Sequence, residues 1–351
     1  MKTVRVTASQ SYDVLVGSGL LGQLGTLASH VCNAQKCLIV SDSNVFPIYG
    51  AAVTGQLTDG GFTVCDPFVF PAGEESKNGS TYLALLNHLA QNRLTRSDMI
   101  IALGGGVVGD LTGFAAATFL RGIDFIQIPT TLLAAVDSSV GGKTAIDLEA
   151  GKNLAGAFYQ PKLVVCDIDT LNSLPKDIFR DGCAEVIKYG VLYDEALFDH
   201  LQERGPDFDR EAVIARCVEL KRDVVALDEF DRGDRMRLNL GHTIGHGVEA
   251  KSHFAVSHGK AVAIGMSIIS RAAAKEGICS WETCETIVNT ICQFGLPART
   301  DYTAEELFVY TLSDKKRSGG SVNLIIPERI GFCRIAPTPV EQVKSMIEAG
   351  L

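Results

Sequence analysis

The side chains best suited to chemistry in this sequence are histidines, and four of the seven lie between residues 242 and 258. Imidazole is the commonest protein ligand for transition metals. If this segment is helical, His242 and His246 are one turn apart on the same face and could hold one ion. The alternative is a pair of buried or capping histidines that bind no metal. A third histidine, His258, follows shortly after them.

A carboxylate that could join these histidines is Glu185, which apolar residues flank at helical spacing. Two histidines and one carboxylate form a catalytic zinc set whose fourth position stays open to water or substrate. Glu185 and Lys188 are also three residues apart, so they could instead form an ordinary ion pair along one helix.

A glycine-rich turn follows the apolar run Met99–Leu103, with Gly104, Gly106 and Gly109 in the pattern G-x-G-x-x-G and a helical pattern from Leu111. Glycines let backbone amides approach a diphosphate at a helix N-terminus. This context favours a dinucleotide or phosphate site over a simple tight turn.

Polar loops after two other strand-like runs could serve the same ligand, because open α/β sheets bind ligands at strand ends. These loops contain Asp42 and Asn44, and Thr130 and Thr131. Basic residues also recur within the motifs. These basic residues are Lys143, Lys152, Lys188, Lys221, Arg235, Lys260, Lys315 and Lys316. Each of them alone is best explained as a solvated surface residue, but together they could bind an anion.

Composition limits the class of protein. A chain of 351 residues is long enough for two domains. A net charge of −9 argues against nucleic acid as a general partner, so an anionic substrate needs a local basic cluster. Ten cysteines without a CxxC pair indicate reduced thiols, and neither a signal core nor a membrane-length apolar span is present. We expect a cytoplasmic protein.

The elements that must position these residues follow two different patterns. In the first half, strand-like runs alternate with helical or turn-rich stretches, which predicts a parallel sheet covered by helices. These runs are residues 37–41, 62–64, 99–103, 125–128 and 163–167. From about residue 176 to 295 the apolar spacing is three and four, with helix-like runs at 212–227 and 262–275. The best boundary lies near Leu171–Pro175.

Taken together and in order, these motifs resemble the 3-dehydroquinate synthase family of sugar phosphate cyclases. The resemblance covers nearly the whole chain, through Asp42–Asn44, Gly73–Lys77, Gly104–Asp110, Arg121, Pro129–Lys143, Gly151–Pro161, Glu185–Gly190, Asn239–His246, His258–Met266 and Asp314–Lys316. It implies an α/β, Rossmann-like dinucleotide-binding domain over residues 1–172. A mostly α-helical metal- and substrate-binding domain is expected over residues 173–351.

The activity implied by this resemblance is a step of the shikimate pathway to the aromatic amino acids. An enzyme with NAD and Zn²⁺, or Co²⁺ in its place, would convert 3-deoxy-D-arabino-heptulosonate 7-phosphate to 3-dehydroquinate and phosphate. The resemblance would assign the metal to Glu185, His242 and His258. In this assignment His246 faces the substrate and is not a metal ligand. The spacing alone would instead favour His242 and His246 as the pair of ligands.

Further roles follow from the same resemblance. Residues implied around NAD are Asp42, Asn44, Glu74, Lys77, Gly105, Gly106, Val107, Val108, Gly109, Asp110, Thr130, Thr131, Lys143, Lys152, Thr170, Leu171, Asn172 and Ser173. Residues implied around the substrate are Asp137, Asn153, Lys188, Lys221, Arg235, Asn239, His246 and either Lys315 or Lys316. Arg121 would reach the neighbouring site of a homodimer.

Three other interpretations stay open. A zinc-dependent NAD polyol dehydrogenase would share the metal and the dinucleotide domain. A sibling sugar phosphate cyclase would share the mechanism and differ in its basic substrate contacts. In a non-catalytic chain the histidines would belong to the core and the glycines to a turn.

Overall fold

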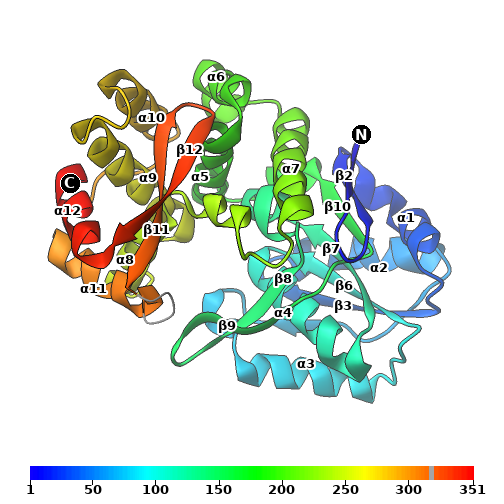
Figure 1. The fold of residues 1–351 in the computed structure, drawn as a ribbon. Helices are drawn as coiled ribbons and strands as arrows, with labels where there is room; N and C mark the ends of the chain where they lie inside the picture. Colours follow the sequence, from blue (N-terminus) through cyan, green and yellow to red (C-terminus); the bar gives the residue numbers. More distant parts are fainter. Residues whose placement is uncertain (316–319) are drawn as a thin grey trace. The chain divides into compact units, whose positions relative to one another are not determined.

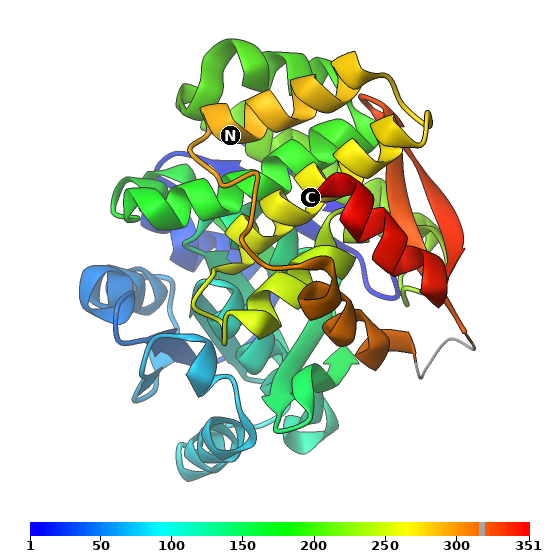
Figure 2. The ribbon, with the colours of Figure 1, turned by 90° about the vertical axis from the view of Figure 1, so that its left-hand side faces the viewer.

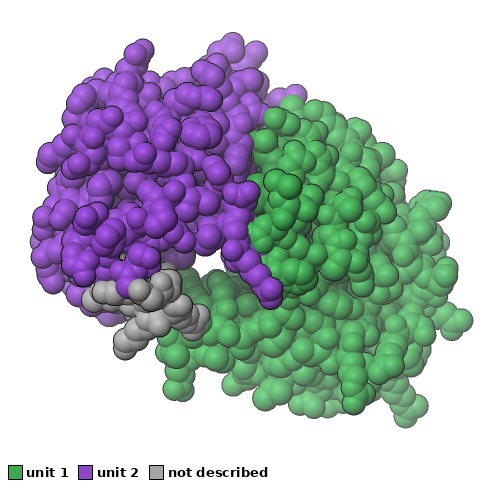
Figure 3. Space-filling model, viewed as in Figure 1, with its two compact units in different colours: residues 1–175, 210–230 green, residues 176–209, 231–351 purple. Residues whose placement is uncertain are grey.

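The computed structural model describes residues 1–315 and 320–351, with the backbone alone for residues 311–315. It divides into two compact units, which Figure 3 shows in different colours. Unit 1 comprises residues 1–175 and 210–230, and unit 2 comprises residues 176–209 and 231–351. The predicted boundary after residue 172 lies close to the end of the first segment. Residues 210–230, expected in the second domain, group with unit 1.

A largely parallel sheet forms the centre of unit 1 (Figure 1). Its strands are β1 (Lys2–Val6), β2 (Tyr12–Gly17), β3 (Lys36–Asp42), β4 (Thr63–Val64), β5 (Phe68–Phe70), β6 (Met99–Gly104), β7 (Asp124–Pro129) and β10 (Leu163–Asp167). They lie in the order β1-β2-β10-β7-β6-β3-β4, and β5 also pairs with β3. β1 runs antiparallel to β2, whereas the other pairs are parallel.

Helices bury both faces of this sheet. Cys37 and Ile39 of β3 pack with α1 (Leu24–Val31) and α2 (Phe46–Asp59). Leu38 and Val40 point to the opposite face and pack with α3 (Gly79–Gln91) and α4 (Gly106–Thr118). A strand buried on both faces must be apolar at successive positions, which is why these runs are continuous in the sequence.

Two further elements complete unit 1. Strands β8 (Lys143–Leu148) and β9 (Gly151–Phe158) form an antiparallel hairpin. Helix α7 (Arg210–Leu227) packs against β1 and β2. The five predicted strands correspond to β3, β4, β6, β7 and β10, whereas β1, β2, β5 and the β8–β9 hairpin were not predicted.

Unit 2 is mainly helical (Figure 2). Its elements are α5 (Lys176–Tyr193), α6 (Glu195–Arg204), α8 (His242–Lys251), α9 (His258–Lys275), α10 (Trp281–Gln293), α11 (Ala304–Lys315), β11 (Ser321–Arg329), β12 (Phe332–Pro339) and α12 (Val340–Gly350). Helix α9 contacts α5, α8, α10 and α12. Since its residues are apolar on nearly all sides from Ala261 to Ala274, burial from several directions is the arrangement that stabilises it.

The predicted fold class, an α/β domain followed by a mainly helical one, is confirmed. Each of the ten cysteines is a free thiol. Within the part of the chain that the structure describes, no helix is both long and apolar enough to cross a membrane.

Candidate active site

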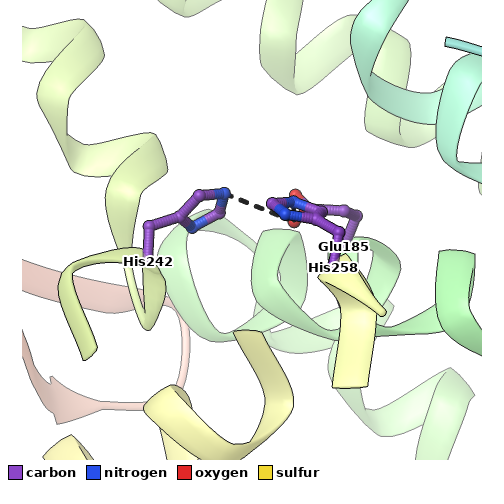
Figure 4. Close-up of side chains that lie close together, drawn as sticks. All are labelled: Glu185, His242 and His258. Atoms are coloured by element: carbon purple, nitrogen blue, oxygen red, sulfur yellow. Dashed lines mark ion pairs between the residues drawn. The ribbon is translucent and has the colours of Figure 1, made fainter. Parts of the chain in front are cut away.

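Three side chains of unit 2 form a cluster suited to a metal ion (Figure 4). Glu185 comes from α5, while His242 and His258 are the first residues of α8 and α9. Their ligand atoms all lie within 4.8 Å of one another, and among the described residues this is the one group of its kind. Oε1 of Glu185 is 3.6 Å from Nε2 of His242 and 3.4 Å from Nε2 of His258.

These separations match the geometry of a bound cation. Two ligands about 2.1 Å from a tetrahedral zinc ion would be about 3.4 Å apart. Two imidazoles and one carboxylate suit Zn²⁺ and also Co²⁺. The sequence spacing favoured His242 with His246, but the structure instead brings His242 together with His258 and Glu185.

Close helix packing brings these ligands together, and glycines make it feasible. A Cβ at Gly265 of α9 would lie 2.0 Å from the carbonyl oxygen of Gly241, just before α8. A Cβ at Gly259 would lie 1.9 Å from the carbonyl oxygen of Asp181 on α5. A side chain at either position would force the backbones apart. Helix α9 can therefore approach α8 and α5 this closely only because residues 259 and 265 are glycines.

The outer nitrogen of each histidine faces an acceptor. Nδ1 of His242 lies 3.1 Å from the carbonyl oxygen of Leu240. Nδ1 of His258 lies 3.6 Å from Oε1 of the buried Glu249. Acceptors at Nδ1 favour the tautomer whose Nε2 lone pair is available to a metal. Sequence reasoning missed Glu249, although its position seven residues after His242 places it on the same face of α8.

The two histidines differ in charge. Burial and the charge of Lys188 lower the pKa of His242 to about 3, so this imidazole is neutral at physiological pH. Burial opposes protonation of His258, but Glu185 and Glu249 outweigh it and raise its pKa to about 10. A divalent cation would displace that proton, because only neutral imidazole ligates.

Of the predicted substrate residues in unit 2, Lys188 and Arg235 are buried and Asn239 and His246 are exposed. Lys188 forms an ion pair with Glu185 inside α5. The His246 ring centroid lies 5.6 Å from that of His242, and His246 stands outside the three-residue cluster. Arg235 and Asn239 belong to the 3₁₀ turn Asp234–Asn239 that leads into α8.

In unit 1, the glycine turn leads from β6 directly into α4. No side chain caps the helix at Gly105. A Cβ at Gly105 would lie 3.0 Å from Thr131, and one at Gly106 would lie 3.2 Å from Ser138. The first turn, which also contains Val107, Val108 and Gly109, is thus an uncapped helix N-terminus with little room for side chains. Such a terminus suits a phosphate group.

Other predicted NAD residues follow the carboxyl ends of adjacent parallel strands. Asp42 ends β3, and its Oδ1 accepts the N–H groups of Asn44 and Val45 at 2.8 and 2.9 Å. Thr130 follows β7 with its hydroxyl buried and, among the described residues, without a hydrogen-bond partner. Beyond β10 lies the turn made of Thr170, Leu171, Asn172 and Ser173. These loops all lie at the carboxyl-terminal ends of the parallel strands, where open α/β folds usually bind their ligands.

A buried lysine organises a polar cluster beside these strand ends. Nζ of Lys77 lies 2.6 Å from Oδ2 of Asp110 and 2.5 Å from Oδ1 of Asn153. Glu74 lies 3.8 Å from the Lys77 ammonium and 3.7 Å from that of Lys152. Burial would lower the pKa of Lys77, but Asp110 and Glu74 outweigh it and raise the pKa. The resemblance had assigned Asn153 to the substrate and the other four to NAD, yet all five lie together.

Six predicted residues remain. Lys221 on α7 donates to the carboxylate of Asp137 at 2.8 Å and to its carbonyl oxygen at 2.6 Å. Asp137 lies in the π-helical turn Ala134–Ser138, a geometry often found at functional sites. Lys143 and Arg121 are exposed. The side chain of Lys315 and the whole of Lys316 lie outside the described residues.

Comparison with known proteins identifies the family. The sequence matches the model described as 3-dehydroquinate synthase N-terminal over residues 67–181 and the model described as 3-dehydroquinate synthase C-terminal over residues 182–317. A 3-dehydroquinate synthase of Clostridium acetobutylicum is 44% identical over 342 residues, covering 95% of this chain and 96% of the relative. One of Enterococcus faecalis is 41% identical over 353 aligned residues, covering 99% and 98%. The chain belongs to the 3-dehydroquinate synthase family.

Solved structures place this family member among cyclases. A 2-deoxy-scyllo-inosose synthase complexed with carbaglucose-6-phosphate, NAD⁺ and Co²⁺ is 25% identical with a TM-score of 0.88, covering both chains fully. A 2-epi-5-epi-valiolone synthase of Streptomyces hygroscopicus with NAD⁺ and Zn²⁺ bound has the same identity and TM-score over 98% of each chain. A Thermotoga maritima butanol dehydrogenase, 14% identical with a TM-score of 0.71 over 100% of this chain and 98% of its own, shares the fold alone. The predicted family and enzyme class are confirmed.

Proposed function

We propose that this chain is a 3-dehydroquinate synthase, which converts 3-deoxy-D-arabino-heptulosonate 7-phosphate to 3-dehydroquinate and phosphate. The observation that carries the proposal is the cluster of Glu185, His242 and His258 in a chain whose relatives carry that name. The reaction comprises oxidation at C5, phosphate elimination, re-reduction, ring opening and an intramolecular aldol closure.

Zn²⁺, or Co²⁺ in its place, fits the cluster by donor type and separation. When bound, the metal would lower the pKa of the substrate hydroxyl that is oxidised. Glu185, His242 and His258 would hold it. Leu240 and Glu249 would orient the two imidazole rings through Nδ1.

NAD fits the uncapped start of α4 and the neighbouring strand ends. When bound, it would accept hydride from C5 and return it to C5 within each turnover. The first-turn amides at Gly105 and Gly106 would face the diphosphate, and the buried Thr130 hydroxyl offers a polar group that lacks a described partner. Lys77 would keep the nearby carboxylates in place.

The substrate carries a carboxylate and a phosphate, and basic residues supply its countercharge. We assign Arg235 and Lys221 to the carboxylate, and Asn153 and Lys315 or Lys316 to the phosphate. Lys143, which the resemblance implies around NAD, would also face the phosphate. Asp137 holds the Lys221 ammonium in one orientation through two contacts. His246 and Asn239, both exposed, would face the reacting hydroxyls, where an imidazole can move a proton.

Assembly as a homodimer, with Arg121 in the partner's phosphate site, completes the proposal. Leu120 and Arg121 have φ of 53° and 67°, left-handed values that cost free energy for residues other than glycine. Such strain concentrates at functional positions. The free thiols support a cytoplasmic location.

One assay tests the activity. Metal-loaded protein incubated with the heptulosonate phosphate and NAD should release inorganic phosphate without net NADH, and a chelator should abolish the release. Accumulating NADH would instead indicate a polyol dehydrogenase. Phosphate release from a different sugar phosphate alone would indicate a sibling cyclase.

A further inference from the structure

A side chain from another helix caps the first turn of α9. Ser257 occupies the N-cap position, but its hydroxyl makes no cap hydrogen bond to the helix. It donates instead to Oδ1 of Asp181 at 2.5 Å, and the same oxygen accepts the backbone N–H of Lys260 at 3.0 Å. Asp181 of α5 therefore takes over the role that an N-cap side chain normally has.

Asp181 joins the two helices at points next to two candidate metal ligands. It precedes Glu185 by one turn on α5, and its partners Ser257 and Lys260 lie on either side of His258. The backbones also meet here, since a Cβ at Gly259 would be 1.9 Å from the Asp181 carbonyl oxygen. The start of α9 is thereby fixed against α5.

We propose that Asp181 is a positioning residue for the metal centre. By holding the Ser257 hydroxyl and the Lys260 amide, it sets Nε2 of His258 at 3.4 Å from Oε1 of Glu185. Two ligands of a single tetrahedral ion require this separation. Loss of the Asp181 hydrogen bonds should therefore weaken metal binding although every ligand is retained. This inference rests on the proposed metal-dependent function.

The test measures the Zn²⁺ affinity of metal-stripped protein by competition with a chromophoric chelator. D181A should bind about 10-fold more weakly, the lower end of the loss seen when residues behind metal ligands are removed. D181N should retain wild-type affinity, because an amide oxygen can accept both hydrogen bonds. S257A, which loses one of the two, should fall between them.

The matched control is E306Q in the same unit. Glu306 accepts hydrogen bonds from Thr303 and pairs with Lys251, so its substitution lowers stability without touching α5 or α9.

Wild-type affinity in both D181A and S257A would overturn the proposal, and so would an equal loss in E306Q. If D181A fails to fold, S257A decides alone, and wild-type affinity in S257A then overturns the proposal. An unmodified chain that binds no Zn²⁺ would overturn the metal-dependent function itself, whereas tight binding by the unmodified chain with D181A and S257A both unaffected would overturn the positioning role only.

Discussion

Histidines with similar sequence surroundings differ in what the structure lets them do. His242 and His258 each present Nε2 to Glu185 and have an acceptor at Nδ1. His246, one turn after His242, is exposed and stands outside this cluster. The distinction depends on contacts between helices, which spacing along one helix does not contain.

Replacing His258 and His246 separately should therefore give different results. His258→Ala removes one of three ligands, and the purified protein should lose its Zn²⁺. His246→Ala should keep wild-type zinc content and lose turnover, because the imidazole would act on the substrate. Elemental analysis together with a phosphate-release assay measures both. Equal zinc loss in the two variants would contradict the assignment.

Part of the site could be predicted from the sequence alone. The residue types and the glycine turn were sufficient to indicate a metal and a dinucleotide. The choice of His258 over His246 needed the family resemblance, since α9 begins sixteen residues after α8 in the chain and the two meet only through tertiary packing. Asp181 and Glu249 were missed because each is a single acid within one helix whose partner lies at the start of another, α9.

At the scale of elements, the glycines between helices determine whether the cluster forms. Gly265→Ala places a Cβ 2.0 Å from the Gly241 carbonyl oxygen, well inside contact distance, and the two helices must separate. Overpacking of this kind costs about 1–3 kcal/mol of unfolding free energy. We expect a lower denaturation midpoint and weaker Zn²⁺ binding.

Gly55→Ala is the matched control for that substitution. Gly55 lies on α2, and nothing stands within 4 Å of the Cβ that alanine would add. Alanine is the better helix former, so this variant should be at least as stable as the wild type. Equal losses in both variants would show that close packing at Gly265 is not the cause.

Helix α11 packs against α8, and its N-terminus carries a pH-dependent interaction. The carboxylate of Glu306 accepts hydrogen bonds from the Thr303 amide and hydroxyl and pairs with Lys251 at 3.0 Å, as in a capping box. The Thr303 amide and Lys251 lower the pKa of Glu306 to about 2 from an ordinary value of 4.5.

Because the folded-state pKa is lowered, this stabilisation is complete above about pH 4.5 and disappears as the pH falls towards 2. Glu306→Gln should therefore lower the thermal midpoint at pH 7, and the difference from wild type should shrink between pH 5 and pH 3. Melting curves across this range measure it. A difference that stays constant down to pH 3 would contradict the interpretation.

Burial explains which elements were predictable. β3 and β6 are covered on both faces, so they appear in the sequence as continuous apolar runs. The β8–β9 hairpin is largely exposed along β9 and polar at several positions, and its sequence resembled a loop. For β11 and β12, the prediction of a helical second domain left no place for strands.

At the scale of the whole molecule, the proposed homodimer makes a prediction about mixed subunits. R121A should disable the partner's site, whereas H258A disables its own metal centre. Each homodimer should be inactive. A heterodimer, formed by co-expression of two differently tagged chains, keeps one complete site and should recover activity. Absence of activity in the purified heterodimer would show that Arg121 acts within its own subunit, whereas an active R121A homodimer would show that Arg121 does not act on the substrate.

The return of α7 to unit 1 has a consequence for recombination. The chain passes between the two units after residues 175, 209 and 230, so neither unit is a single continuous piece. A chimera joined at residue 172 to a relative's second half would bring a foreign α7 against the native β1 and β2, with a foreign residue facing Asp137 in place of Lys221. Exchanges of the helical unit among cyclases should succeed only when residues 210–230 remain with the sheet.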